Sequence, residues 1–352
     1  MHLFLFLNLF LSMICFWNEY TQHFETKRTS TSSAPFSILF FSTSFFVLTI
    51  ELINRWISSK HIPLSNLYES LLFLNWNLIA IYFFLIRNEI WTKEGATRPI
   101  AASSTGIVQP NIYDHTESNE VANRSTKSRS FIDMESIILF FQIYTKPLGL
   151  IGPLLSSIIL FIQSFADWRL PDEMKQIQPL IPALQSNWLL MHVSIMILSY
   201  AALFVGCILA ITYVGAEWYL NLDGRASLRH ESQSTVSQSE INISAKSYFT
   251  KLDSLSYRIL AFAFPLLTLG ILSGAIWANE AWGSYWSWDP KETWAFITWL
   301  IFAFYLHTRL QYKWEGSKSA SVASIGFFII WICYLGVNLL GQGLHSYGWI
   351  NN

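Results

Sequence analysis

The chain has few charged residues for its length. Of its 352 residues, 13% are charged, whereas 52% are hydrophobic and 16% aromatic; soluble domains carry about 25% charged residues. This composition is that of a polytopic membrane protein and excludes an ordinary soluble domain. The formal net charge of -1 says little, because what matters in a bilayer protein is which loops hold the Lys and Arg residues. Nucleic acid is not an expected partner of such a protein.

Cysteine is also scarce, and several catalytic motifs are absent. The three cysteines, Cys15, Cys207 and Cys333, lie far apart in apolar runs without Cys-x-x-Cys spacing. We interpret them as small core residues, and not as a redox pair, a zinc site or a covalent haem anchor. The sequence contains no P-loop and no His-Glu-x-x-His motif, which argues against ATP hydrolysis and zinc proteolysis.

Long apolar stretches are abundant. A bilayer core of about 30 Å needs roughly 17 to 25 apolar residues per helix. The first stretch is interpreted as a retained helix, because it has no basic n-region and no small-x-small cleavage pattern. The sequence therefore predicts an all-α, polytopic fold with a single membrane domain over residues 1–352. The eight predicted spans are approximately 1–17, 35–53, 68–87, 147–166, 188–214, 257–278, 292–311 and 320–341.

The basic residues are distributed unevenly between the two faces that these spans define. Alternate connections and their helix ends hold 17 of the 22 Lys and Arg residues. Basic loops favour the cytoplasm-like side, so both termini and the loop near residue 285 are predicted on the opposite face, called the far face below. Segments 92–129 and 221–251 are polar and are predicted to be mobile surface insertions on the basic side.

Tryptophans gather in one connection, the tryptophan loop, over residues 277–294. Six of the 16 tryptophans lie between Trp277 and Trp299. Because Trp favours places where one edge is apolar and the other wet, we expect a flat, rigid aromatic shelf that suits a large planar ligand with polar edges. An interfacial belt is the alternative, although belts spread over many helix ends. Trp299, within a span, is also explained by packing alone.

Three histidines lie inside or beside predicted spans, where such side chains are functional candidates. His192 and His345 fall on the far face and flank the tryptophan loop, whereas His307 lies 17 residues after Pro290, roughly 26 Å lower at 1.5 Å per residue. Two imidazoles across an apolar shelf suit the axial positions of haem iron. The single imidazole of His307 would need a second ligand from a partner chain. For each histidine, a hydrogen bond to a neighbouring helix is the simpler alternative.

Asp289 begins the span that follows the tryptophan loop. Asp289-Pro290-Lys291-Glu292 offers an N-cap, a proline at the first helical position and a glutamate at the third. Capping fully explains Asp289, and contact with haem is the alternative. Lys291 and Glu280 are further candidates for contact with haem propionates.

The motifs resemble a known family. Six segments carry the resemblance: Trp-Gly-Ser-Tyr-Trp-Ser-Trp-Asp-Pro-Lys-Glu-Thr-Trp-Ala (282–295), Gly-Ile-Leu-Ser-Gly-Ala-Ile-Trp-Ala-Asn (270–279), Tyr-Leu-His-Thr-Arg (305–309), 336–348 with His345, 182–192 with His192, and 61–70. They resemble the tryptophan-rich "WWD" haem-handling membrane proteins, and specifically the CcsA family of system II cytochrome c biogenesis. The likeness as a whole covers about half of the chain densely.

The resemblance implies a function and a set of site residues. It implies that the chain, with a CcsB-type partner, moves reduced haem b across the membrane and attaches it to the Cys-x-x-Cys-His motif of an apocytochrome c. His192 and His345 match the pair that ligates haem on the far face, and His307 matches a transmembrane haem ligand. The expected haem contacts are completed by Trp282, Trp286, Trp288 and Asp289.

The sequence leaves alternatives open for both the membrane in which the protein lies and its activity. The likeness to plastid-encoded members implies the thylakoid membrane, with the tryptophan loop toward the lumen; a bacterial plasma membrane is the alternative. A haem exporter or chaperone without ligase activity, and a di-haem or quinone-reactive electron-transfer subunit, are the rival functions. The latter class usually pairs histidines at matched depths, and His307 has no such partner in the predicted topology.

Overall fold

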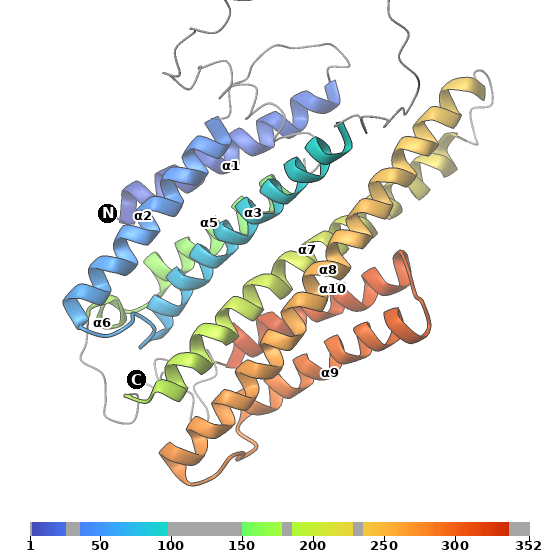
Figure 1. Cartoon of the computed structure of the whole chain (residues 1–352). Coiled ribbons are helices and arrows are strands. Elements are labelled where there is room, and N and C mark those ends of the chain that lie inside the picture. The colour runs from blue at the N-terminus through green and yellow to red at the C-terminus, as the bar shows by residue number, and fades with distance from the viewer. Residues whose placement is uncertain (1, 26–35, 98–149, 178–184, 228–234, 338–352) are drawn as a thin grey trace, which may run out of the picture.

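The computed structural model describes residues 2–25, 36–97, 150–177, 185–227 and 235–337, and the regular elements in these residues are all helices (Figure 1). The predicted all-α polytopic fold is confirmed, and each of the eight predicted spans corresponds to a helix. The helices are α1 (His2–Glu25), α2 (Phe36–Ser59), α3 (Leu67–Thr97), α5 (Ile151–Arg169), the short α6 (Asp172–Lys175), α7 (Asn187–Ser227), α8 (Thr235–Trp282), α9 (Pro290–Gln311) and α10 (Ser317–Trp331), which continues as the π-helix η2 (Ile332–Gly336).

Within the described residues, seven helices are long and apolar enough to cross a membrane. They are α1, α2, α3, α5, α7, α8 and α10 with η2. The eighth, α9, has 22 residues and is long enough to span a bilayer. Its tryptophans, His307 and Arg309 lower its mean hydropathy below that of the other seven. This is the sequence feature that separates α9 from an ordinary lipid-facing span.

Helices α7 and α8 are longer than the sequence predicts. They contain 41 and 48 residues, or about 62 Å and 72 Å at 1.5 Å per residue, against a bilayer core of about 30 Å. Figure 1 shows the pair running side by side and projecting beyond the other helices at one end. Most of the predicted insertion 221–251 is therefore helical. Of the insertion 92–129, the structure describes only the last turns of α3, to Thr97.

The helices form two neighbouring groups that meet at α7. Helices α1, α2, α3 and α5 pack on one another, as do α7, α8, α9 and α10, and α7 also contacts α3 and α5. Within its most apolar stretch, 83% of α7 is buried inside the molecule, which makes α7 the central helix. Successive spans alternate in direction, so the start of α7, the α8–α9 connection and the α2–α3 connection lie at the same end (Figure 1).

Small residues bring α7 and α8 into close contact. A Cβ added to Gly206 of α7 would lie 2.6 Å from Leu260 Cδ2, and one added to Gly270 of α8 would lie 2.5 Å from Met196 Sδ. Ser256 and Ser199 donate hydrogen bonds of 2.8 and 3.0 Å to carbonyls of the facing helix. Close backbone approach and interhelical hydrogen bonds are the usual means by which helices associate in lipid, and here they fix α8 against α7 over several turns.

Candidate functional site

His192 lies near the start of α7 and points toward α8. Its Nδ1 is 2.7 Å from the carbonyl oxygen of Gly270, and its ring lies directly over Gly274, where a Cβ would be 2.5 Å from both Cε1 and Nδ1. The side chain is half-buried. The turn of α7 that carries His192 is therefore fixed against the last turns of α8, a few residues before the tryptophan loop.

The hydrogen bond of His192 determines which ring nitrogen carries the proton. A carbonyl oxygen can only accept, so Nδ1 must donate and the neutral imidazole has its lone pair on Nε2. Histidines that bind metals generally donate their second ring nitrogen in this way, which sets the tautomer and the ring orientation. The bond to Gly270 is also the hydrogen bond to a neighbouring helix that was the simpler alternative for this histidine, and it leaves the imidazole lone pair on Nε2.

Two acidic residues fix the tryptophan loop between α8 and α9. Asp289 caps α9 by accepting a 2.8 Å hydrogen bond from the Lys291 N–H, and Glu292 completes a capping box. The Glu292 carboxylate also accepts the Ser287 N–H at 2.9 Å. The predicted N-cap is confirmed. Asp289 is 6% exposed, so its carboxylate serves to hold the end of the loop rather than to present a charge on its surface.

The tryptophans of the loop do not form one flat surface. The rings of Trp277 and Trp282 meet at 69° with centroids 4.7 Å apart, and those of Trp286 and Trp288 meet at 86° at 5.9 Å. The expected flat shelf is therefore wrong for these pairs, because indoles favour edge-to-face contact over coplanar alignment. The loop is a corrugated aromatic surface.

Exposure divides these aromatic residues into two classes. Trp288 is 70% exposed, Tyr285 60% and Trp282 37%, whereas Trp277 is 4% exposed. Trp299 donates its indole N–H to Thr268 Oγ1 of α8 at 2.9 Å, which gives it a packing role, as its position within the span suggested. The exposed group is therefore the part of the loop that is available to a ligand.

His307 lies at the opposite end of α9 and is exposed. It shares one helix face with Phe296, Leu300 and Phe304, which are 39%, 46% and 51% exposed. Its ring contacts Tyr312 edge to face, with centroids 5.8 Å apart. His307 and His192 therefore lie toward opposite ends of the helical bundle, as the two predicted depths require.

The base of α9 below His307 is rigid. The guanidinium of Arg309 donates to Asp253 of α8 at 2.9–3.0 Å and to the Trp314 carbonyl at 3.0 Å, and it lies 4.9 Å from the centroid of the Tyr257 ring. Bidentate pairs of this kind combine strength with a fixed geometry. They hold the end of α9, and therefore the backbone of His307, against α8.

His345 lies outside the described residues, which end at Val337 in this part of the chain. The segment that leads toward it is tied to two other helices. In η2, Cys333 and Tyr334 contact α7 and α3: the Tyr200 hydroxyl is 3.2 Å from Cys333 Sγ, and Tyr334 donates to Ser70 Oγ at 3.1 Å. π-helical turns carry one extra residue and are frequent at functional sites.

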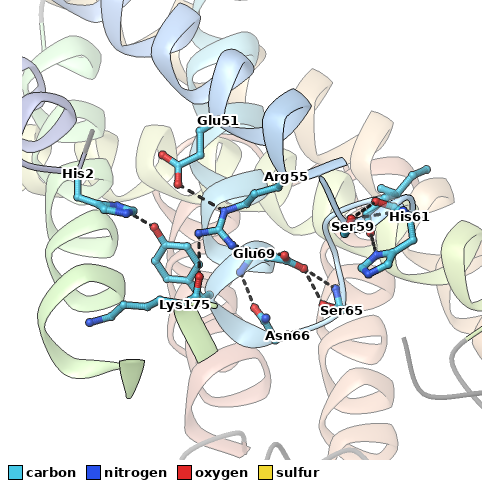
Figure 2. A network of polar contacts seen from close by, with 11 residues as sticks. His2, Glu51, Arg55, Ser59, His61, Ser65, Asn66, Glu69 and Lys175 are labelled. Carbon is cyan, nitrogen blue, oxygen red and sulfur yellow. Dashed lines mark hydrogen bonds and ion pairs between the residues drawn. The ribbon is translucent and has the colours of Figure 1, made fainter. Parts of the chain in front are cut away.

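A buried ionic network at the far-face end of α2 and α3 was missed by the sequence analysis. Figure 2 shows Arg55 between Glu51 and Glu69; its Nε is 3.4 Å from Glu51 Oε1, and its Nη1 is 3.6 Å from Glu69 Oε1. Arg55 also donates to the Lys175 carbonyl at 3.0 Å and lies over the Tyr68 ring at 4.7 Å. The signal was present, because an ionisable residue within a span is functionally or structurally significant by default.

The glycines under His192 were also missed as site residues. Gly270 and Gly274 belong to segment 270–279, which carries the family resemblance, but the sequence assigned them no role of their own. Their small-x-x-x-small spacing in an apolar helix is a known signal of close helix contact. What the sequence does not give is which side chain of the neighbouring helix occupies the space above them.

The chain matches known proteins over most of its length. A family model described as cytochrome C assembly protein matches residues 126–345. A Chlorella vulgaris protein described as "Cytochrome c biogenesis protein CcsA" is 43% identical over 98% of this chain and 95% of its own length. Proteins of the same description from Pyropia yezoensis and Guillardia theta are 42% and 40% identical over 86% and 98% of this chain, and 84% and 95% of theirs. This chain belongs to the CcsA family of cytochrome c biogenesis proteins.

Membership of the CcsA family confirms the resemblance drawn from the motifs. The region matched by the family model includes His192, His307 and His345 as well as the whole tryptophan loop. The chain is a multi-pass membrane protein of cytochrome c assembly, a process that handles haem.

Proposed function

We propose that this CcsA-family chain presents reduced haem b, its substrate, at the far face of the membrane for covalent attachment to apocytochrome c. His192 and His345 ligate the haem iron, and the exposed Trp282 and Trp288, together with the half-buried Trp286, contact the ring. Asp289 acts through the loop by fixing its junction with α9. The observation that carries the proposal is the Nδ1 hydrogen bond of His192 to Gly270, which prepares Nε2 to bind iron.

The attachment step requires positioning more than chemical catalysis. Each thiol of the Cys-x-x-Cys-His motif adds across a vinyl double bond of haem: sulfur bonds to one carbon, the proton ends on the other, and there is no net oxidation. Holding thiol and vinyl groups together supplies much of the rate in such reactions. The histidine of the apocytochrome then displaces one of the two ligands, which releases the product.

His307 belongs to a second haem position, nearer the basic side. Its exposure on the apolar face of α9 supports this assignment, because an ionisable side chain that faces lipid is costly. A CcsB-type partner supplies the opposite axial ligand there. The membrane is the thylakoid membrane, with the tryptophan loop toward the lumen.

The test is haem ligation in cells that make this chain, its CcsB-type partner and a reporter apocytochrome. We expect His192→Ala and His345→Ala to lower the haem content of the purified complex and to abolish ligation, and we expect added imidazole to restore part of both. His61→Ala serves as the matched control, because His61 lies in the α2–α3 connection at the same end and its Nδ1 bonds locally to the Ile62 carbonyl at 3.0 Å. Wild-type haem content and ligation in the double alanine variant would exclude the ligand assignment.

The same preparation separates the proposal from the electron-transfer alternative. The complex should form holocytochrome only when apocytochrome is present, and it should not oxidise a quinol in its absence. Quinol oxidation without apocytochrome, together with unchanged ligation in the histidine variants, would favour an electron-transfer subunit.

A further inference from the structure

Two glycines of α8 form a groove that receives two side chains of α7. Gly270 and Gly274 lie four residues apart on α8, and His192 and Met196 lie four residues apart on α7. A Cβ on Gly270 would meet Met196 Sδ at 2.5 Å, and a Cβ on Gly274 would meet the His192 ring at 2.5 Å. Any larger residue at 274 must therefore displace the imidazole. We call this pair of positions the glycine groove.

The floor of the groove also provides the hydrogen-bond acceptor. The Gly270 carbonyl accepts Nδ1–H of His192 at 2.7 Å. It lies 3.0 Å from the Ser273 hydroxyl, which also donates to the Leu269 carbonyl at 2.8 Å. The ring is thus held by contact across its face and by a short bond at its edge. These two constraints together determine both its orientation and its tautomer.

We propose that the glycine groove is the positioning element for the haem ligand His192 and that it tunes how firmly Nε2 holds iron. The inference rests on the proposed function. An acceptor on Nδ1–H makes Nε2 a stronger ligand. A carbonyl, being neutral, leaves the imidazole less anionic than a carboxylate partner does. A ligand of intermediate strength suits a site that must bind haem and then release it to apocytochrome.

The central test is Gly274→Ala in the full chain with its partner. The added methyl group pushes the ring out of the groove, so haem affinity falls on the order of 10- to 100-fold, as for other changes around metal-binding histidines. The bis-imidazole low-spin absorption and EPR signals give way to a high-spin species. Added imidazole restores the low-spin signals, which a general folding defect does not allow.

Two glycines of α7 provide matched controls. Gly206→Ala also introduces a methyl group between α7 and α8, and its nearest neighbours are Leu260, with Cδ2 at 2.6 Å, and Ile259. Gly215→Ala adds a methyl group where no atom lies within 4 Å. Both variants should keep the low-spin spectrum. If Gly206→Ala loses the signals as Gly274→Ala does, the effect belongs to helix packing in general and the groove has no special role.

If Gly274→Ala does not accumulate in the membrane, a second variant tests the role of the Gly270 carbonyl. Ser273→Ala removes a competing donor from the Gly270 carbonyl without adding an atom. The bond from His192 then strengthens and favours ferric iron, so the midpoint potential of the bound haem becomes more negative. An unchanged or more positive potential would overturn the role of the carbonyl.

Separate variants test the proposed function and the role of the glycine groove. If His192→Ala keeps its haem and its ligation activity, the proposed function loses its ligand. If His192→Ala is defective while Gly274→Ala has wild-type affinity and spectrum, only the glycine groove is excluded.

Discussion

Trp288 holds a backbone conformation that is costly for a tryptophan. Its φ is 58°, in the left-handed region, which costs roughly 1–2 kcal/mol for a residue with a Cβ. Its side chain is 70% exposed, so burial does not offset this cost. The hydrogen bonds of Glu292 and the cap by Asp289 on either side hold the backbone there. Strain maintained at an exposed aromatic residue supports the proposed contact of this indole with haem.

Replacing Trp288 by glycine should separate stability from function. Glycine adopts a positive φ without strain but gains freedom in the unfolded chain, so thermal stability should stay within about 1 kcal/mol of wild type. Haem retention in the purified complex should fall. Unchanged haem content and ligation would show that the Trp288 ring does not contact haem.

The matched control for this prediction is Trp299→Phe. It removes the hydrogen bond to Thr268 and should cost about 1 kcal/mol of stability while leaving the haem spectrum intact. The exposed Trp288 should thus affect haem retention and not stability, whereas the packed Trp299 should affect stability and not haem retention.

At the residue scale, predictions were confirmed where the interactions involve only neighbouring residues in the sequence. The N-cap at Asp289 follows from four consecutive residues, and the structure has it. The flat arrangement of the indoles was wrong because ring angles depend on packing partners such as Phe296, which lies 6.3 Å from Trp286 at 80°. A count of tryptophans contains no information about those angles.

At the scale of elements, the ionic network joins α2 to α3 inside the membrane domain. Glu51 is 3% and Glu69 1% exposed, and both face the single guanidinium of Arg55. Among the described residues, Glu51 Oε2 has no hydrogen-bond partner. The network therefore holds more negative charge than Arg55 alone neutralises, and removing the cation has a different effect from removing a carboxylate.

We expect Arg55→Met to destabilise the protein strongly, by about 3–5 kcal/mol, because it leaves two buried carboxylates without their cation. Glu51→Gln should be tolerated far better, since it removes a charge and adds an N–H donor of the same shape. Thermal unfolding of the detergent-purified chain measures both. Equal losses in the two variants would contradict the charge imbalance inferred here.

The helices themselves were predictable because length and apolarity decide which segments cross a bilayer. The same reasoning did not predict how far α7 and α8 extend beyond it, since hydropathy marks the membrane boundary and not the end of a helix. It also missed Arg55 and Glu51, because an average over a window of apolar residues hides single charges. The glycine groove needed knowledge of which helix faces which, and only the folded structure gives that.

At the scale of the whole molecule, the alternation of helices places the functional elements on two sides. The α2–α3 connection and the tryptophan loop lie at one end, and the α9–α10 connection lies at the other (Figure 1). Helix α9, with 22 residues, is about 33 Å long, enough to separate its two ends by a bilayer core. The C-terminal ends of α3 and α7 and the start of α8, which lead into the basic connections of the sequence, lie at the same end as the α9–α10 connection (Figure 1). The positive-inside rule predicts that this end faces the cytoplasm-like side.

This arrangement predicts the accessibility of single cysteines from each side of the membrane. Ser58, Ser284 and Glu315 are exposed and lie in or beside the α2–α3, α8–α9 and α9–α10 connections. The background is favourable, because Cys207 and Cys333 are buried, and Cys15→Ala removes the half-buried third thiol. In sealed vesicles whose outer surface is the basic side, a membrane-impermeant maleimide should label Glu315→Cys at once. It should label Ser58→Cys and Ser284→Cys only after permeabilisation.

The outcome tests whether α9 crosses the membrane and does not depend on whether α1 does. If α1 did not cross the membrane, the orientation of α2 to α10 with respect to one another would be kept, and the three labels would still divide in the same way. If α9, the span with the lowest apolarity, did not cross, Ser284→Cys and Glu315→Cys would react from the same side. Such a result would place His307 at the level of His192 and remove the physical basis for two haem positions.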